Sequence, residues 1–230
     1  MVASLLAVGA GAALLGGWWS PWARGLAQGV DVSRYQGAID WRALAADDVG
    51  FVYIKATEGS DYVDPRFVSN WAGAGAVGLP RGAYHFFTLC RSGAEQAANF
   101  IRVVPRGTGG LPHALDLEHL GPCRTRPAMT DVAGEARVFL DRVAAHYGRR
   151  PVIYTTEEFH DLHLARMTGE RFWMRSLFGR PRARAGEWVL WQHHNRGRRR
   201  GVSGPVDLNA FRGDARAFAQ WALGATEPRW

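Results

Sequence analysis

Short apolar runs alternate with amphipathic stretches along most of this chain. Eight of the runs are rich in β-branched and aromatic residues, which favour strands. These runs are residues 29–32, 51–55, 81–87, 111–118, 151–155, 171–176, 188–192 and 205–208. Apolar residues at helical spacing lie between or after them. The predicted helices cover residues 39–48, 65–77, 92–104, 130–147 and 214–223.

This alternation predicts an α/β fold with a parallel-stranded barrel, because each helix would return the chain to the start of the next strand. The spacers shorten after the fifth predicted strand, so fewer helices are expected there. We find no internal repeat and no linker, and we expect a single catalytic domain over residues 28–223, followed by a short tail over 224–230. In such a barrel the functional site lies at the carboxyl ends of the strands.

The N-terminal segment has a different composition from the rest of the chain. Residues 1–23 carry no charged side chain, and the apolar stretch 5–15 is followed by a tryptophan cluster. A cleavable signal peptide over residues 1–27 fits the small residues Gly25 and Ala27 at the −3 and −1 positions. An uncleaved membrane anchor fits the length and the tryptophans equally well. Both alternatives predict export to a periplasmic or extracellular location, and the second predicts anchoring to the inner membrane.

Four acidic residues follow short apolar runs: Asp31, Asp116, Glu118 and Asp207. Asp116 and Glu118 are two positions apart, so in a strand both point to one face and Leu117 points to the other. Their Cα atoms would lie about 6.5 Å apart. Repulsion between the two carboxylates should raise one pKa, as a general acid at neutral pH requires. The alternative for each of the four is a solvated carboxylate in a turn.

Seven motifs carry a resemblance to a known family. They are DVSRYQGAIDW, KATEG, GAYHFF, ALDLE, PVIYT, WVLWQ and GPVDLNAF. Their order resembles that of the glycoside hydrolase family 25 muramidases, the Chalaropsis-type lysozymes, over about residues 28–223. The resemblance implies an irregular TIM-like α/β barrel with reduced later helices. It also implies hydrolysis of the β-1,4 bond between N-acetylmuramic acid and N-acetylglucosamine in peptidoglycan, without a metal or organic cofactor.

The same resemblance suggests roles for individual residues. Glu118 is expected to be the general acid, and Asp116 to assist it or to orient the 2-acetamido group of the substrate. Asp31 and Asp207, from the first and last strands, are expected to be neighbours that bind sugar hydroxyls, polarise water or hold the ring. Substrate binding is expected at Tyr84, Tyr154, Trp191 and Gln192, the alternative for the aromatics being burial in the core.

One departure from the family pattern concerns the motif WVLWQ and the residue that follows it. The family commonly has Trp-Gln-Tyr where this chain reads Trp191-Gln192-His193. We expect the change to alter a sugar contact rather than the chemistry. A metal site at His113, Asp116, Glu118 and His119 is disfavoured, because strand alternation turns both histidines away from the two acids.

The chain carries a formal net charge of +7 and has a sequence pI of about 10.1. This excess predicts an anionic partner: a cell-wall polymer, an anionic membrane or nucleic acid. Much of the positive charge lies in the arginine-rich runs 180–184 and 196–200. The alternative interpretation of these runs is that they are solvated loops without a binding partner. Export argues against nucleic acid. We therefore expect a monomer that acts on peptidoglycan strands at the anionic wall surface, with residues 1–23 as the tether if they are retained.

Two alternatives to an enzyme remain. The first is a catalytically weak glycan-binding protein on the same barrel, which the intact pair Asp116 and Glu118 argues against. The second is a binder of nucleic acid or another anionic polymer that uses the arginine runs, and the export segment argues against nucleic acid.

Cys90 and Cys123 are the only cysteines, and export places them in an oxidising compartment. They follow consecutive predicted strands that reach the same end of the barrel, so we expect a disulfide that closes a 33-residue loop. The chain-entropy model gives roughly 3–4 kcal/mol of stabilisation for such a loop. The alternative is two unpaired, buried thiols.

Overall fold

The computed structural model describes residues 23–107, 109–119, 121, 123, 129–182 and 188–224. The targeting segment expected at the N-terminus lies outside these residues except for its last five positions. Part of the first arginine run and nearly all of the short tail also lie outside them. Among the described residues, no helix combines the length and the apolar character needed to cross a membrane.

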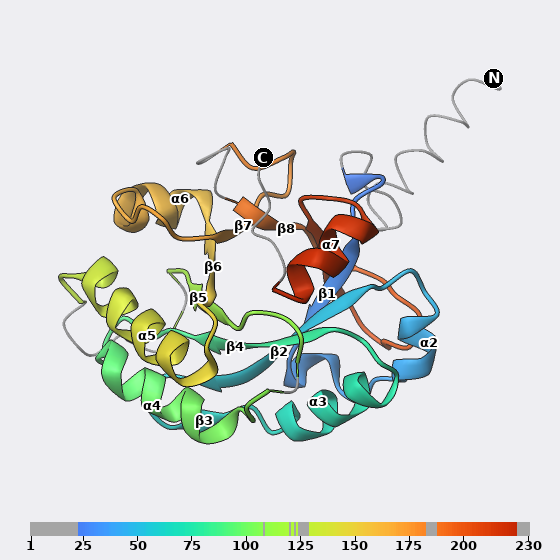
Figure 1. Ribbon diagram of the computed structural model, residues 1–230, viewed down its shortest axis with the longest axis horizontal. Coiled ribbons are helices and arrows are strands. Elements are labelled where there is room, and N and C mark those ends of the chain that lie inside the picture. The colour runs from blue at the N-terminus through green and yellow to red at the C-terminus, as the bar shows by residue number, and fades with distance from the viewer. Residues whose placement is uncertain are drawn as a thin grey trace.

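One sheet contains all the strands named in the described chain, and it closes on itself as a barrel (Figure 1). Its strands are β1 (Gln28–Val32), β2 (Phe51–Glu58), β3 (Tyr62–Val63), β4 (Arg81–Phe86), β5 (Ala114–Leu117), β6 (Val152–Thr156), β7 (Phe172–Arg175), β8 (Trp188–Gly197) and β9 (Val206–Phe211). The short β3 is an antiparallel addition to β2. The other eight form the barrel, which is closed because β1 pairs with both β2 and β9.

The direction of the last strand differs from the prediction. Strands β1, β2, β4, β5, β6, β7 and β8 run parallel in that order, whereas β9 is antiparallel to both of its neighbours. The expected closed barrel is confirmed, but the expectation of an all-parallel sheet is wrong. The link 198–205 between β8 and β9 is shorter than the dozen or so residues that a parallel crossover needs, so the chain turns back.

The helices are unevenly distributed around the barrel. They are α2 (Trp41–Ala45), α3 (Phe67–Ala76), α4 (Gly93–Val103), α5 (Val132–Tyr147), α6 (Glu157–Phe159) and α7 (Ala215–Ala222). Figure 1 shows α4 and α5 side by side against the early strands. Between β6 and β7 the helical segment consists only of α6 and one π-helical turn, His160–Leu164. The reduction of the later helices is therefore confirmed.

Local sequence signals explain where the longer helices begin and end. Ser92 and Glu95 form a reciprocal capping box at the start of α4, as the Ser-x-x-Glu spacing predicts. The Asp131 side chain accepts a hydrogen bond from the Gly134 amide at the start of α5. Gly148 ends α5 in the left-handed region at φ 74°.

Two apolar clusters hold the barrel. The larger lies between the outside of the strands and the helices α2 to α5, and it includes Leu117. The smaller fills the barrel interior with aromatic residues and is closed at one end by α7. There Phe218 stacks on Phe51 with ring centroids 5.0 Å apart, and Trp221 packs on Phe211 at 5.1 Å. The opposite end of the barrel stays open for a site.

Candidate active site

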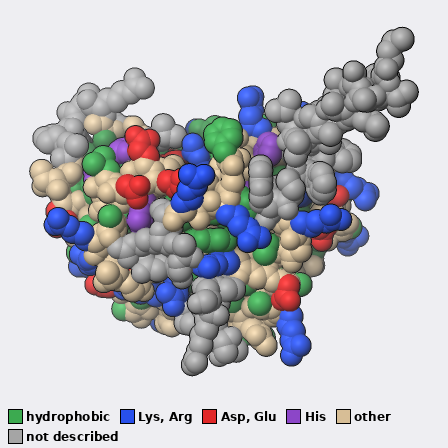
Figure 2. Space-filling view, turned by 90° about the horizontal axis from the view of Figure 1, so that it is seen from above, with side chains coloured by type: hydrophobic (Ala, Val, Ile, Leu, Met, Phe, Trp, Pro, Cys, Tyr) green, Lys and Arg blue, Asp and Glu red, His purple; other side chains and the backbone are tan. Residues whose placement is uncertain are grey.

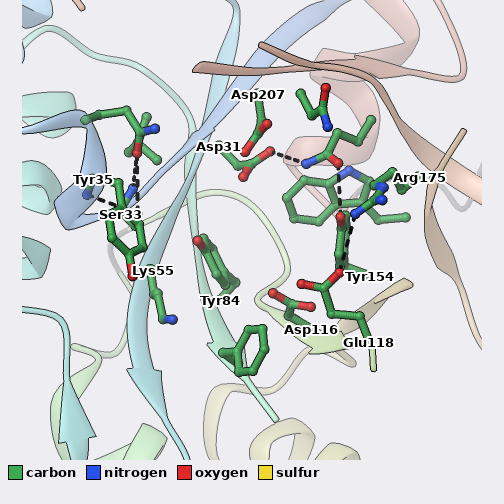
Figure 3. Close-up of a pocket in the computed structure, with 16 residues that line it drawn as sticks. Asp31, Ser33, Tyr35, Lys55, Tyr84, Asp116, Glu118, Tyr154, Arg175 and Asp207 are labelled. Carbon is green, nitrogen blue, oxygen red and sulfur yellow. Dashed lines mark hydrogen bonds and ion pairs between the residues drawn. The ribbon is translucent and has the colours of Figure 1, made fainter. Parts of the chain in front are cut away.

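A pocket of about 250 Å³ lies at the end of the barrel where the parallel strands finish (Figure 3). All four acidic residues singled out in the sequence line it: Asp31, Asp116, Glu118 and Asp207. Asp31 comes from β1, Asp116 from β5 and Asp207 from β9, and Glu118 directly follows β5. The barrel therefore brings together carboxyl groups that lie up to 176 positions apart in the sequence.

Asp31 and Asp207 lie opposite each other in the β1–β9 pair. Asp207 lies near the start of β9, not at the end of its strand as expected. Because β9 runs antiparallel, its start lies at the same end of the barrel as the carboxyl ends of the other strands. The reversal of β9 is therefore what places Asp207 in the pocket.

Asp116 and Glu118 point into the pocket, while Leu117 between them belongs to the outer apolar cluster. This confirms the alternation expected from their spacing. Burial, more than any other cause, raises the pKa of Asp116 well above its usual range, and the charge of Glu118 adds to the rise. Burial also raises the pKa of Glu118, while Arg175 opposes the rise with its Nη1 3.6 Å from Glu118 Oε2. The predicted raised pKa is thus confirmed, but desolvation is a larger cause than repulsion.

A chain of hydrogen bonds crosses the floor of the pocket. The Tyr154 hydroxyl donates to Gln192 Oε1 at 3.0 Å, and Gln192 Nε2 donates to Asp31 Oδ2 at 3.0 Å. Asn209 Nδ2 donates to the same Asp31 oxygen at 2.8 Å. Trp173 Nε1 in turn donates to Asn209 Oδ1 at 2.8 Å. Asp31 is therefore held by the side-chain amides of Gln192 and Asn209, and each of these amides also accepts a hydrogen bond from a ring N–H or O–H.

The carboxyl groups of Asp31 and Asp207 interact, and Asp207 is the one that holds a proton. Burial raises the pKa of Asp31, and the hydrogen bonds from Asn209 and Gln192 oppose that rise. Burial, followed by the charge of Asp31, raises the pKa of Asp207 to about 9. Asp207 is therefore protonated at neutral pH, and its O–H donates to Asp31.

Asp116 is held much less completely. Its side chain is buried, with 7% of the residue exposed, yet its Oδ1 has no hydrogen-bond partner in the described chain. A buried carboxyl oxygen without a partner is unusual, because its desolvation is not compensated.

The residues expected to bind substrate divide into two groups. Tyr84, Tyr154 and Gln192 line the pocket, and burial raises the pKa of the Tyr84 hydroxyl well above its usual range, so it remains a donor. The structure does not bring Trp191 there: it is fully buried behind β8 and donates from Nε1 to the Ser176 carbonyl at 2.7 Å. Because Gln192 faces inward, its neighbours Trp191 and His193 face outward.

His193 lines a different cavity, between the β8–β9 region and the segment that precedes β1. The expected effect of His193 on a sugar contact in the acidic pocket is therefore not supported by its position.

Several lining residues were missed by the sequence reasoning. They are Tyr35, Lys55, Trp173, Arg175 and Asn195, among others. Trp173 and Arg175 are two positions apart on β7, so both point into the pocket, as Asp116 and Glu118 do at the end of β5. The same two-residue spacing in the sequence could have identified them. Tyr35 lies in a 3₁₀ turn, Arg34–Gln36, that Ser33 and Gln36 cap reciprocally, and it is 77% exposed at the pocket margin.

The two histidines near the acids have structural surroundings. His113 Nδ1 accepts a hydrogen bond from the Ala83 amide at 3.2 Å, and the ring packs against Tyr147. His119 packs against Phe159 and His163. Within the residues that the structure describes, no group of three or more potential ligands could hold a metal ion.

Cys90 and Cys123 form the expected disulfide, with their Cα atoms 5.6 Å apart. The bridge ties the chain that follows Glu118 to the loop that follows β4. It therefore limits how far the end of β5 can move.

A barrel with paired carboxyl groups in a pocket lined by tyrosine and tryptophan has the composition of a glycoside hydrolase site. The model of the glycosyl hydrolases family 25 matches residues 30–202, and the chain belongs to this family.

Individual relatives are similar over most of the chain. The uncharacterized protein YegX of Escherichia coli (strain K12) is 36% identical over 206 residues, covering 86% of this chain and 74% of YegX. Lysozyme M1 of Streptomyces globisporus is 36% identical over 201 residues, covering 82% of this chain and 68% of that lysozyme. The solved structure of a family 25 glycosyl hydrolase from Bacillus anthracis has a TM-score of 0.79 at 37% identity, covering 86% of this chain and 94% of the other.

Proposed function

We propose that this protein is a peptidoglycan muramidase that hydrolyses the β-1,4 bond between N-acetylmuramic acid and N-acetylglucosamine. The observation that carries the proposal is the convergence of Asp31, Asp116, Glu118 and Asp207 in one pocket of a family 25 barrel. The similarity to Lysozyme M1 supports the same activity. All four carboxyl groups come from one chain, so we propose that a monomer is sufficient.

Glu118 is the proposed general acid. It lies at the pocket surface with 13% of its side chain exposed, so it can reach a glycosidic oxygen, and burial raises its pKa. Because the pKa of Asp116 is also raised, the pair retains a proton at neutral pH. Glu118 would give this proton to O4 of the departing N-acetylglucosamine as its bond to the anomeric carbon breaks.

Asp116 is proposed to orient the 2-acetamido group of the muramoyl residue. Its side chain lines the pocket, so its carboxyl group can accept a hydrogen bond from the acetamido N–H. The acetamido oxygen would then bond to the anomeric carbon as the glycosidic bond breaks. Water, deprotonated by Glu118, would next attack that carbon and regenerate the acetamide. This route uses the substrate as its own nucleophile, and it requires no metal or organic cofactor.

Asp31 and Asp207 are proposed to hold the sugar and the water. Asp207, protonated at neutral pH, donates its hydrogen bond to Asp31, so its other oxygen can accept from a sugar hydroxyl. Tyr84 and the exposed Tyr35 provide further contacts for the glycan.

We further propose that the protein acts outside the cytoplasm, at the anionic surface of the cell wall. The formal charge of +7 supports this, and Figure 2 shows Lys and Arg side chains distributed across one face. Residues 1–23 are proposed to direct export, either as a cleaved signal or as a retained membrane tether. The mass of the mature exported protein distinguishes these two alternatives.

Analysis of the released fragments tests the function. Purified peptidoglycan is digested, the new reducing ends are reduced with borohydride, and the fragments are analysed by mass spectrometry. A muramidase produces N-acetylmuramitol ends, whereas N-acetylglucosaminitol ends would contradict the proposal. Binding without release of fragments would instead indicate the glycan-binding alternative. The Glu118→Gln variant provides the matched background.

A further inference from the structure

Two cationic side chains, Lys55 and Arg175, face the acidic groups among the described residues that line the pocket (Figure 3). Lys55 is already neutralised, because its Nζ lies 2.7 Å from Glu58 Oε2. It also lies over the Phe86 ring at 4.7 Å, and only 12% of its side chain is exposed. Lys55 is therefore a buried, paired cation with little capacity for a new anion.

Arg175 is in a different situation. Its side chain is 34% exposed, and its ion pair in the described chain is the contact of 3.6 Å with Glu118, which is longer than a hydrogen bond. A guanidinium carries five N–H donors arranged to bind a carboxylate through two parallel hydrogen bonds. Arg175 therefore keeps donors available at the pocket surface, beside the proposed general acid.

We propose that Arg175 binds the free lactyl carboxylate of the muramoyl residue at the cleaved bond, so that the enzyme prefers glycan strands stripped of their stem peptides. This inference rests on the proposed muramidase function and specifies its substrate. Arg175 is a specificity residue here: it contacts the substrate's charged substituent, not the reacting atoms.

The position of Arg175 favours this carboxylate over other anions of the wall. A cation next to Glu118 lies close to the bond that Glu118 protonates, and the lactyl group is carried by O3 of the same muramoyl ring, two ring carbons from the anomeric carbon of that bond. In a peptide-bearing strand the lactyl carboxyl is an uncharged amide. The next carboxylate then lies on the second amino acid of the stem, about 7 Å further along an extended chain. N-acetylglucosamine carries no carboxylate at all.

Binding of a carboxylate would also change the neighbouring acid. Arg175 lowers the pKa of Glu118 against the effect of burial. A lactyl carboxylate that pairs with Arg175 offsets this cationic charge, so Glu118 holds its proton more strongly in the complex. The preference is thus expected in kcat as well as in KM.

The test compares three substrates made from one peptidoglycan preparation. The first is glycan stripped by an N-acetylmuramoyl-L-alanine amidase, which leaves free lactyl carboxylates. The second is the same stripped glycan with these carboxylates converted to neutral methylamides. The third is the intact, peptide-bearing strand. Wild type, Arg175→Gln, Arg175→Lys and Arg196→Gln are compared; Arg196→Gln removes one charge from an exposed position on β8, outside the pocket.

We expect wild type to cleave the free acid with a kcat/KM about tenfold or more above that for the methylamide. Arg175→Gln should bring this ratio close to one, Arg175→Lys should retain part of it, and Arg196→Gln should leave it unchanged. A ratio of two substrates does not depend on the fraction of folded enzyme.

Three results would overturn the inference. They are equal cleavage of acid and methylamide by wild type, a preference that survives in Arg175→Gln, and a preference for the peptide-bearing strand that Arg175→Gln abolishes. The last would assign Arg175 to a stem-peptide carboxylate. Absence of cleavage of all three substrates would instead reject the muramidase function itself.

Discussion

The two carboxyl pairs of the pocket differ in how firmly the protein holds them. Asp31 accepts hydrogen bonds from Gln192 and Asn209, and its partner Asp207 lies directly across the β1–β9 pair. Asp116 has an oxygen without a partner in the described chain, and Glu118 has a loose ion pair at 3.6 Å. One pair is fixed by the fold, and the other is available to react.

This difference indicates a division of labour. Groups that position a substrate benefit from being fixed, because the binding geometry is then preorganised. Groups that exchange protons with the substrate or accept hydrogen bonds from it must keep hydrogen-bonding capacity unused until the substrate binds. The unsatisfied oxygen of Asp116 costs stability in the free protein, because its desolvation is not compensated.

The largest expected effect comes from the proton donor of the loosely held pair. Glu118→Gln retains the shape of the side chain but cannot donate a proton, so kcat should fall by about two to four orders of magnitude. Release of soluble fragments from purified peptidoglycan measures the loss, and circular dichroism checks the fold. Near-normal turnover in a folded variant would remove Glu118 from the mechanism.

Asp116→Asn tests the other member of this pair. We expect a loss of kcat of about a hundredfold, because the amide can no longer share a proton with Glu118 or accept from the acetamido N–H as strongly. Thermal stability should be retained, because Oδ1 has no partner to lose. A substrate with its acetamido groups removed provides the check: it lacks the proposed nucleophile, so neither wild type nor the variant should cleave it.

The firmly held pair should instead respond in stability. Asn209→Leu leaves the Trp173 N–H without its acceptor and removes a donor from Asp31, which should lower the free energy of unfolding by about 2–4 kcal/mol. Asn70→Leu is a matched control, because Asn70 is also buried but its Nδ2 has no partner in the described chain. Chemical denaturation measures both. Equal losses would mean that the network adds nothing beyond burial.

The pH dependence of stability sharpens the comparison further. The pKa of Asp207 is about 9 in the folded protein against an ordinary value of 3.8, so the folded state binds its proton more tightly. The resulting stability is complete below about pH 4 and is lost as the pH rises towards 9. Between pH 5 and 9 we expect the Tm of wild type to fall, and that of Asp207→Asn to fall by about 10 °C less. Parallel curves would show that Asp207 is already ionised.

The smallest effect is expected far from both pairs. Arg198 and Arg200 are exposed in the link before β9 and do not line the acidic pocket. Their joint replacement by Ser should weaken association with whole cell walls at low salt by about twofold to fivefold, because screening acts over about 10 Å at 0.1 M salt. Hydrolysis of short soluble glycans should not change. An equal loss on both substrates would place this link in the substrate groove.

The sequence was sufficient for features that depend on local spacing. Asp116 and Glu118 could be assigned to one face of a strand because two positions decide the matter. The barrel followed from the alternation of strands and helices, and the disulfide from two cysteines after neighbouring strands. Each of these inferences uses residues that lie close together in the chain or at equivalent ends of neighbouring strands.

Other features depend on partners that no local pattern identifies. Asn209 and Gln192 bind Asp31 across separations of 178 and 161 residues, so only the closed barrel shows the network. The direction of β9 follows from the short link before it. Trp191 was expected in the pocket because it is aromatic. Side chains alternate along a strand, so an inward-facing Gln192 requires an outward-facing Trp191.

The closure of the barrel through β1 has a consequence for when activity can begin. Strand β1 carries Asp31 and pairs with both β2 and β9. The pairing of the first strand is therefore complete only when the last strand is present. Loop closure over such a distance is a slow, late step in folding. A chain of this topology that left a channel N-terminus first would not complete the acidic pocket until residue 209 had followed. Under the proposed export, a wall-cutting activity built in this way would stay inactive until its last strand had crossed.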